Sequence, residues 1–187
     1  MKIGVLGLQG AVREHLWALK ACGVETVTVK DPTDLQGLKG LIIPGGESTT
    51  VGKLLVRYGL WEPLKERAHY GMGIFGTCTG MILLSRNPEN SLQPRLGLMK
   101  FGAVRNAFGR QIESFEADLS IPVLGEPAFP AVFIRAPYGV DPGPGVEVLA
   151  TFEEKIVLAR EGKFLACAFH PELTNDLRLH KYFLDLL

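Results

Sequence analysis

The pentad Gly76-Thr77-Cys78-Thr79-Gly80 lies between two short apolar runs, and it constrains this chain more than any other segment. A G-x-nucleophile-x-G sequence between a strand and a helix predicts a nucleophile elbow, a tight turn that exposes one side chain above the end of a sheet. The helix expected from Thr79 points its positive end at the sulfur, which favours the thiolate. Cys78 is therefore a candidate nucleophile for acyl transfer through a thioester.

A candidate base lies far downstream, in Ala168-Phe169-His170-Pro171-Glu172-Leu173. Pro171 disfavours helical backbone at His170, and in an extended segment residues i and i+2 face the same way. We therefore expect Glu172 to lie beside His170 and orient its ring, while His170 accepts the proton of Cys78. Taken singly, a Cys with apolar neighbours or a His at a strand end is more often a structural residue. The two motifs together favour a catalytic triad.

The first half of the chain alternates strand and helix patterns, which is typical of a mainly parallel sheet with helices on both faces. Residues 96–160 contain strand-like runs separated by Pro and Gly clusters, so we expect a small antiparallel section there. A length of 187 residues suits a single α/β domain over 1–187. We expect an exposed loop over 86–95. Strands are expected at 2–8, 24–29, 41–43, 74–75 and 164–169, and helices at 11–21, 48–57, 61–69, 79–85 and 175–187.

Charge and cysteine usage exclude several classes of protein. The 20 basic and 20 acidic residues balance, so no basic excess points to nucleic acid. No apolar stretch is long enough for a membrane span and no signal-peptide pattern is present, so we expect a cytoplasmic protein. Three widely spaced cysteines predict neither a disulfide framework nor a zinc site. We expect no metal and no cofactor.

A second turn motif is Pro44-Gly45-Gly46-Glu47-Ser48-Thr49-Thr50, which follows a short buried strand. Paired glycines expose backbone N–H groups, and the N–H of Gly46 could form an oxyanion hole with the N–H of Thr79. The alternative is an ordinary strand-to-helix turn with a helix cap.

Together these motifs resemble class-I glutamine amidotransferases, flavodoxin-like α/β proteins whose Cys-His-Glu triad hydrolyses glutamine to glutamate and ammonia. The finer resemblance is to the glutaminase subunits of pyridoxal 5'-phosphate synthase, and it covers essentially the whole chain. It rests on residues 8–15, 44–50, 105–111, 133–137 and 168–173. Thr79 stands where that family often has alanine, a change that keeps the backbone N–H.

The resemblance implies a role for each matching residue. Cys78 would be the nucleophile, His170 the general base and acid, and Glu172 the orienting carboxylate. The substrate, L-glutamine, carries an ammonium and a carboxylate, so Glu47 and an arginine are sensible partners. Contacts to it would come from Gly46, Glu47, Ser48, Arg105, Ile134 and Arg135.

The resemblance also implies a partner. In this family the glutaminase docks onto a synthase subunit, a (β/α)8 barrel that receives the ammonia through a tunnel and uses it for pyridoxal 5'-phosphate (vitamin B6) biosynthesis in a hetero-oligomer. Docking is expected to complete the oxyanion hole near Gly45 and Gly46. The segment Gln9 to His15, with Gln9, Arg13 and Glu14, is expected to form part of the docking face.

Two alternatives stay open at this point. One is a free-standing γ-glutamyl hydrolase of the same fold, which would turn over without a partner. The other is a non-catalytic domain that keeps Cys78 as a redox sensor, although such a thiol needs no acid-base pair like His170 and Glu172.

Overall fold

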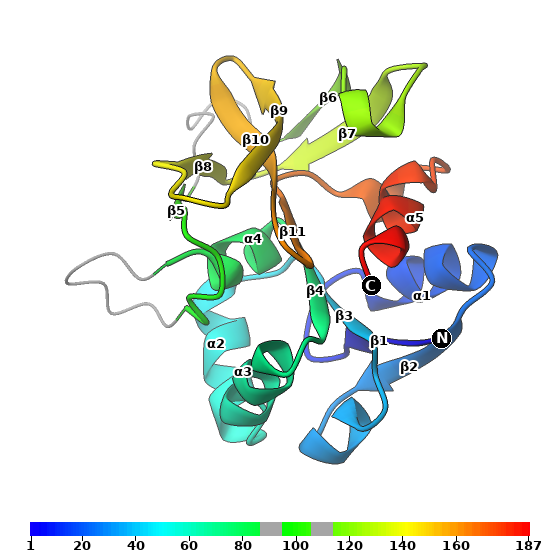
Figure 1. Cartoon of the computed structure of the whole chain (residues 1–187), viewed down its shortest axis with the longest axis vertical. Helices are drawn as coiled ribbons and strands as arrows, with labels where there is room; N and C mark the ends of the chain where they lie inside the picture. The colour runs from blue at the N-terminus through cyan, green and yellow to red at the C-terminus, as the bar shows by residue number, and fades with distance from the viewer. Residues whose placement is uncertain (87–94, 106–113) are drawn as a thin grey trace.

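The computed structural model describes residues 1–86, 95–105 and 114–187, and its centre is a β-sheet covered by helices (Figure 1). Five neighbouring strands are parallel, in the order β2 (Glu25–Val29), β1 (Lys2–Leu6), β3 (Gly40–Ile43), β4 (Gly73–Thr77) and β11 (Phe164–Cys167). Every residue of β3 and β4 is buried, as expected for strands covered on both faces. The prediction of a mainly parallel central sheet is confirmed.

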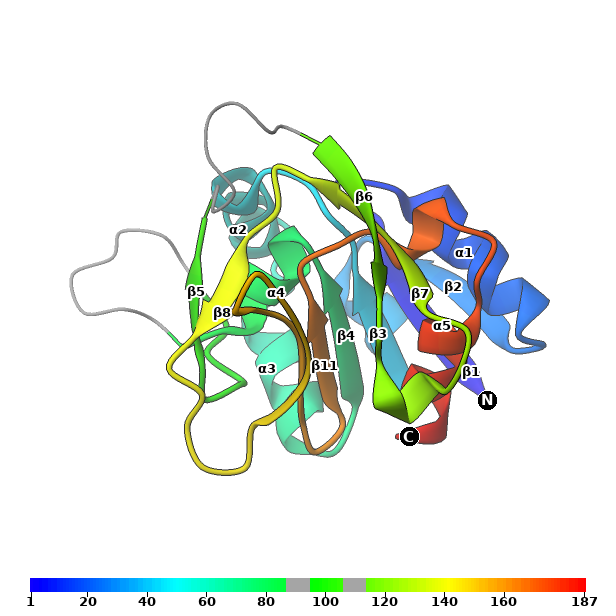
Figure 2. The same cartoon turned by 90° about the horizontal axis from the view of Figure 1, so that it is seen from above.

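Helices cover both faces of this sheet (Figure 2). One face carries α1 (Val12–Ala21) and α5 (Arg178–Asp185), and the other carries α2 (Ser48–Arg57), α3 (Trp61–His69) and α4 (Thr79–Leu84). Alternate residues of β4 point to opposite faces of the sheet. Phe75 packs against Phe183 of α5 with ring centroids 5.6 Å apart, whereas Gly76 faces α4. None of the helices in the described ranges is long and apolar enough to cross a membrane.

The helix boundaries agree with the sequence patterns except at the C-terminus. The bounds of α2 and α3 are as predicted, but the helix expected over 175–187 begins only at Arg178. The Thr174 hydroxyl accepts from the Asp176 N–H, and the Asp176 carboxylate accepts from the Arg178 N–H. These side chains satisfy backbone donors outside the helix, which delays its start.

The antiparallel section is also confirmed. Strand β10 (Lys155–Glu161) runs antiparallel to β11 and extends the sheet through β8 (Tyr138–Val140), β5 (Gly102–Val104) and β9 (Glu147–Phe152). A separate antiparallel pair consists of β6 (Ser114–Leu119) and β7 (Phe129–Ile134). The described residues also form the 3-10 turns η1 (Pro32–Leu35), η2 (Pro122–Leu124) and η3 (Pro171–Leu173). Of the loop expected over 86–95, residues 87–94 lie outside the described residues.

The β6–β7 pair packs on the segment that carries His170. Phe115 and Phe133 stack with centroids 4.6 Å apart, and Phe133 meets Phe169 edge-on at 5.6 Å. The N–H of His170 donates to the Val132 carbonyl of β7 at 2.8 Å. These contacts fix the backbone of His170 at the end of β11.

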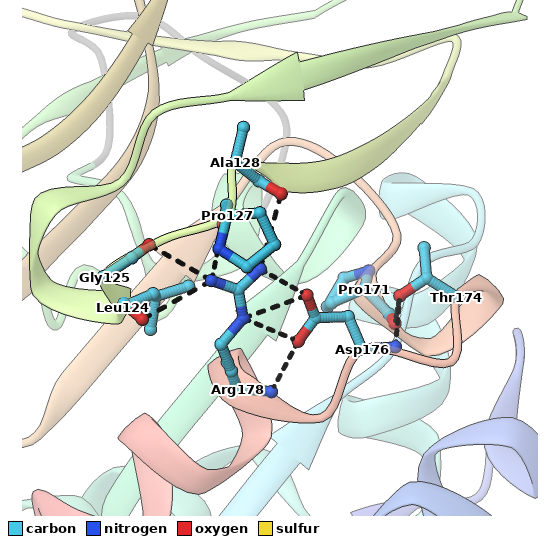
Figure 3. A network of polar contacts seen from close by, with 8 residues as sticks. All are labelled: Leu124, Gly125, Pro127, Ala128, Pro171, Thr174, Asp176 and Arg178. Carbon is cyan, nitrogen blue, oxygen red and sulfur yellow. Dashed lines mark hydrogen bonds and ion pairs between the residues drawn. The ribbon is translucent and has the colours of Figure 1, made fainter.

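An arginine anchors the chain that follows η3 (Figure 3). Arg178 donates to the Asp176 carboxylate at 2.6 Å and to backbone carbonyls of the loop before β7, at 2.6 Å for Pro127 and 3.1 Å for Gly125. One planar guanidinium with five N–H groups can serve several acceptors at once. This network ties the connection between η3 and α5 to residues 124–128.

Removing the guanidinium should therefore loosen the C-terminal part of the fold. We expect Arg178→Met to lower the free energy of unfolding by about 1–3 kcal/mol, because backbone carbonyls lose charged donors, and to lower Tm by roughly 2–12 °C for a chain of this size. Lys53→Met, on the exposed side of α2, is the control. Equal melting temperatures for the two variants, measured by calorimetry, would contradict the anchoring role.

Candidate active site

Cys78 occupies the turn between β4 and α4. Its backbone lies at φ 49° and ψ −101°, in the region that non-glycine residues rarely adopt, and its N–H donates to the Cys167 carbonyl of β11 at 2.8 Å. At Gly80 a Cβ atom would collide with the Ile43 carbonyl of β3, so only glycine lets α4 approach the sheet this closely. The strand-turn-helix arrangement predicted from the pentad is present.

His170 and Glu172 meet as predicted, but by a different backbone path. His170 Nδ1–H donates to Glu172 Oε1 at 2.8 Å, and Glu172 is only 5% exposed. The expectation of an extended segment through Glu172 is wrong, since Pro171–Leu173 forms the 3-10 turn η3. Proline suits the first position of a helical turn because it lacks an N–H, and it keeps His170 itself non-helical at φ −111° and ψ 84°.

The same region brings the imidazole to the nucleophile. A Cβ atom at Gly45 would lie 2.5 Å from His170 Cε1 and 3.4 Å from the Cys78 Cβ, so the three residues are in close contact. Burial opposes the charged ring, but hydrogen bonds to Cys78 and Glu172 and the charges of both raise the pKa of His170 to about 10. Both partners therefore stabilise the imidazolium, the form of the ring that can donate a proton.

A cavity of about 450 Å³ opens beside Cys78. Its wall includes all of the residues predicted to contact substrate. Gln9 and Ile82, which were not expected there, also line it. The predicted contacts in the wall are Gly46, Glu47, Ser48, Arg105, Ile134 and Arg135. Segments that are far apart in sequence thus meet at the carboxyl ends of β1, β3 and β4, where open α/β sheets bind ligands.

Glu47 has a structural partner as well as a place in the cavity. Its carboxylate caps α2 by accepting from the N–H groups of Thr49 and Thr50 at 3.0 and 2.7 Å, and it pairs with Arg105 at 3.1 Å. The hydroxyl of Thr50 and these N–H groups lower the pKa of Glu47 to about 2. Glu47 therefore acts as an ordinary helix cap, which was the alternative interpretation of this turn. The same residue was predicted to bind substrate.

The glycine turn before α2 is held from two sides. The Gln9 side-chain carbonyl accepts from the Glu47 N–H at 2.7 Å, and the Thr79 hydroxyl donates to the Gly46 carbonyl at 2.5 Å. Thr79 thus contacts the turn through a hydroxyl that alanine lacks. Gln9, expected on a docking face, is exposed but also supports this turn.

The other expected docking residues border a groove between α1 and η3. Arg13, Glu14 and Trp17 line a depression of about 590 Å³ together with Glu172 and Leu173. His15 does not share this surface, because it is fully buried. His15 therefore cannot contribute to the docking face expected for the segment 9–15, because the helix turns that position toward the sheet.

Two buried histidines near the triad were not anticipated. His15 and His180 are both 0% exposed and lie 3.0 Å apart, and His15 also reaches Glu172. A signal was available, because His15 falls on the apolar stripe of its helix with Leu16 and Leu19. Within the described residues, no group of three or more His, Cys, Asp or Glu side chains could hold a metal ion.

The cap at Glu47 predicts a pH-dependent stability. Its folded pKa of about 2 lies below the ordinary 4.5, so its stabilisation is present above 4.5 and is lost as the pH falls toward 2. We expect Glu47→Gln to be less stable than wild type at pH 7, with a smaller difference at pH 3, in urea unfolding. Glu62→Gln, in the first turn of α3 but not its cap, is the control. A difference that stays constant with pH would contradict the role of the charge.

Glu172 should control the titration of His170. In Glu172→Gln the ring loses its anionic neighbour, so we expect the pKa of His170 to fall below the wild-type value. Titration of the ring carbon and nitrogen signals by NMR measures this, with Glu25→Gln at the remote end of β2 as the control. An unchanged titration of His170 would show that Glu172 does not stabilise the imidazolium.

Comparison with known proteins agrees with this geometry. The model of the SNO glutamine amidotransferase family matches residues 5–187. The chain is 63% identical to the pyridoxal 5'-phosphate synthase subunit PdxT of Pelotomaculum thermopropionicum, covering 99% of this chain and 94% of that protein, and 58% identical to that of Moorella thermoacetica over the full length of both. A crystal structure of a glutamine amidotransferase superposes with a TM-score of 0.92 at 52% identity, covering 98% of this chain and 97% of that one. The chain therefore belongs to the SNO glutamine amidotransferase family.

Proposed function

We propose that this chain is the glutaminase component of a pyridoxal 5'-phosphate synthase, and that it hydrolyses L-glutamine to L-glutamate and ammonia. The observation that carries the proposal is the meeting of Cys78, His170 and Glu172 beside a cavity lined by both acidic and basic side chains. The names of the relatives described above supply the pathway. Residues 1–187 act as one glutamine amidotransferase domain.

The chemistry starts from the Cys78 thiolate and the His170 imidazolium. The thiolate attacks the side-chain amide carbon of glutamine, and the N–H groups of Gly46 and Thr79 hold the oxyanion. His170 gives its proton to the departing nitrogen, so ammonia leaves and a thioester remains on Cys78. His170 then takes a proton from water, the hydroxide attacks the thioester, and glutamate leaves as the thiolate re-forms.

Binding of glutamine uses the charges around the cavity. Glu47 attracts the ammonium of the substrate, and an arginine takes its carboxylate. Arg105 and Arg135 both line the cavity, and Arg105 already pairs with Glu47 at 3.1 Å. An incoming amino acid with both charges can replace that pair by two new ones, one to each side chain. Ser48 and the backbone at Ile134 complete the wall.

The ammonia passes to a synthase subunit. That partner docks on the face that includes Gln9, Arg13 and Glu14, and the resulting hetero-oligomer works in the cytoplasm. The contact from Gln9 to the Glu47 N–H supports this placement, because a partner that touches Gln9 acts directly on the turn that contains Gly46. No nucleic acid takes part.

The two alternatives are less well supported. A free-standing γ-glutamyl hydrolase would not be expected to share up to 63% identity with proteins named as synthase subunits. A redox sensor would leave the buried His170–Glu172 pair without a task.

The direct test measures glutamate release from glutamine, with and without the synthase subunit that accompanies the Pelotomaculum relative. We expect turnover to rise sharply with the partner and to fall by about 10³-fold or more in Cys78→Ala. Cys22→Ala, at a partly exposed cysteine outside the cavity, is the matched control and should retain full activity.

Other outcomes would change the proposal. Equal turnover without the partner would favour the free-standing hydrolase. Absence of turnover under both conditions, with a folded protein that binds the synthase, would contradict the glutaminase assignment.

A further inference from the structure

Two fully buried histidines extend the polar contacts of the triad into the core. His15 comes from α1 and His180 from α5, and their facing nitrogens, Nδ1 of His15 and Nε2 of His180, are 3.0 Å apart. Both rings pack edge-on to Phe75 of β4, with centroids 6.5 and 5.9 Å away. Imidazoles in such apolar surroundings are costly unless they are paired, so the pair calls for an explanation.

The other nitrogen of His15 lies at the triad. His15 Nε2 is 3.3 Å from Glu172 Oε2, the carboxylate oxygen that His170 does not use, and 3.3 Å from the Thr77 hydroxyl of β4. His15 Nε2 is aligned for a hydrogen bond with the Thr77 hydroxyl. Glu172 Oε2, in contrast, has no aligned hydrogen bond among the described residues. The approach to Glu172 is therefore an electrostatic contact at short range between two side chains that are both 0% exposed.

The chemistry of these groups fixes where the protons are. An ionised carboxylate only accepts, so a lone pair on His15 Nε2 would face a negative charge at 3.3 Å, whereas an N–H there is attracted. With Nε2 protonated, His15 Nδ1 accepts from the Nε2–H of His180. The reverse arrangement would place a proton on His180 Nδ1, which is buried and has no partner among the described residues.

Both rings are neutral in this arrangement. Burial lowers the pKa of His15, although the nearby Glu172 charge opposes this, and burial together with His15 lowers the pKa of His180 to about 3. The two N–H groups then point the same way: that of His180 in α5 toward His15, and that of His15 in α1 toward Glu172.

We propose that His15, held in one tautomer by His180, is a positioning residue for the triad that fixes Glu172 so that its Oε1 faces His170. The inference rests on the proposed glutaminase function. Without the His15 N–H, Glu172 Oε2 would lose the N–H that faces it at 3.3 Å, and the buried carboxylate would be free to turn toward another donor. Rotation of the carboxylate breaks its 2.8 Å contact with His170.

The test compares two variants of the same length and flexibility. Glutamine has an amide nitrogen as many bonds from Cβ as Nε2 of histidine, so His15→Gln keeps a donor toward Glu172, whereas His15→Met removes it. In the complex with the synthase subunit, we expect His15→Met to lower kcat about 10- to 100-fold, the loss of one interaction with a charged group, at unchanged KM for glutamine. His15→Gln should restore most of this loss.

A purely structural role would give a different result. Equal kcat values for His15→Gln and His15→Met, or a change confined to KM, would overturn the proposal. Thermal unfolding of both variants accompanies the kinetics, so that a loss of folded protein is not counted as a loss of turnover.

A second measurement needs neither a variant nor glutamine turnover. In wild-type protein labelled with ¹⁵N-histidine, long-range ¹⁵N–¹H correlations identify which ring nitrogen carries the proton. We expect the Nε2–H form for both His15 and His180. An Nδ1–H form at His15 would overturn the inference even if the protein is a glutaminase, and the Nε2–H form would stand even if glutamine proved to be the wrong substrate.

Discussion

The catalytic end of this protein depends on a backbone approach that leaves no room for side chains. At Gly80 the first turn of α4 lies against the Ile43 carbonyl of β3, and at Gly45 the chain leaving β3 lies against the His170 ring. A Cβ at either position would push the elbow or the imidazole outward. The sulfur of Cys78, the ring of His170 and the turn at Gly46 therefore converge only because adjacent parallel strands end in glycine-containing turns at the same edge of the sheet.

Electrostatics then assigns the roles within that arrangement. Burial alone would favour a neutral His170, yet Cys78 and Glu172 together raise its pKa to about 10, while His15 and His180 stay neutral a few ångströms away. The difference arises because burial is the largest cause that lowers the pKa of His15 and of His180, and the charge of His170 lowers the pKa of His15 further. One buried carboxylate can thus stabilise one imidazolium while the two fully buried histidines nearby stay neutral.

Much of this could be predicted from sequence because the signals are local. Gly80 and Pro171 mark turns, because the local geometry there follows from the residue types themselves. The bounds of α2 and α3 follow from apolar periodicity. The path from His170 to Glu172 was predicted as extended and is a 3-10 turn, because proline at position 171 is compatible with both. The contact between His15 and His180 joins residues 165 positions apart, and no local pattern encodes such a pairing. The start of α5 depended on hydrogen bonds from Thr174 and Asp176, which propensity does not reveal.

Helix α1 connects the triad to the surface. Its inner side carries His15, in contact with Glu172, and its outer side carries Arg13 and Trp17 along the groove beside η3. Helix α1 packs directly on η3, and His15 Nε2 lies 3.3 Å from Glu172 Oε2. A synthase subunit bound to the outer side of α1, as we propose, would therefore act on Glu172 through this helix, and a contact with Gln9 would act on the turn at Gly46. In the proposed arrangement, His15 and Gln9 each connect the docking face to one part of the site: His15 to the His170–Glu172 pair, and Gln9 to the turn proposed to form the oxyanion hole.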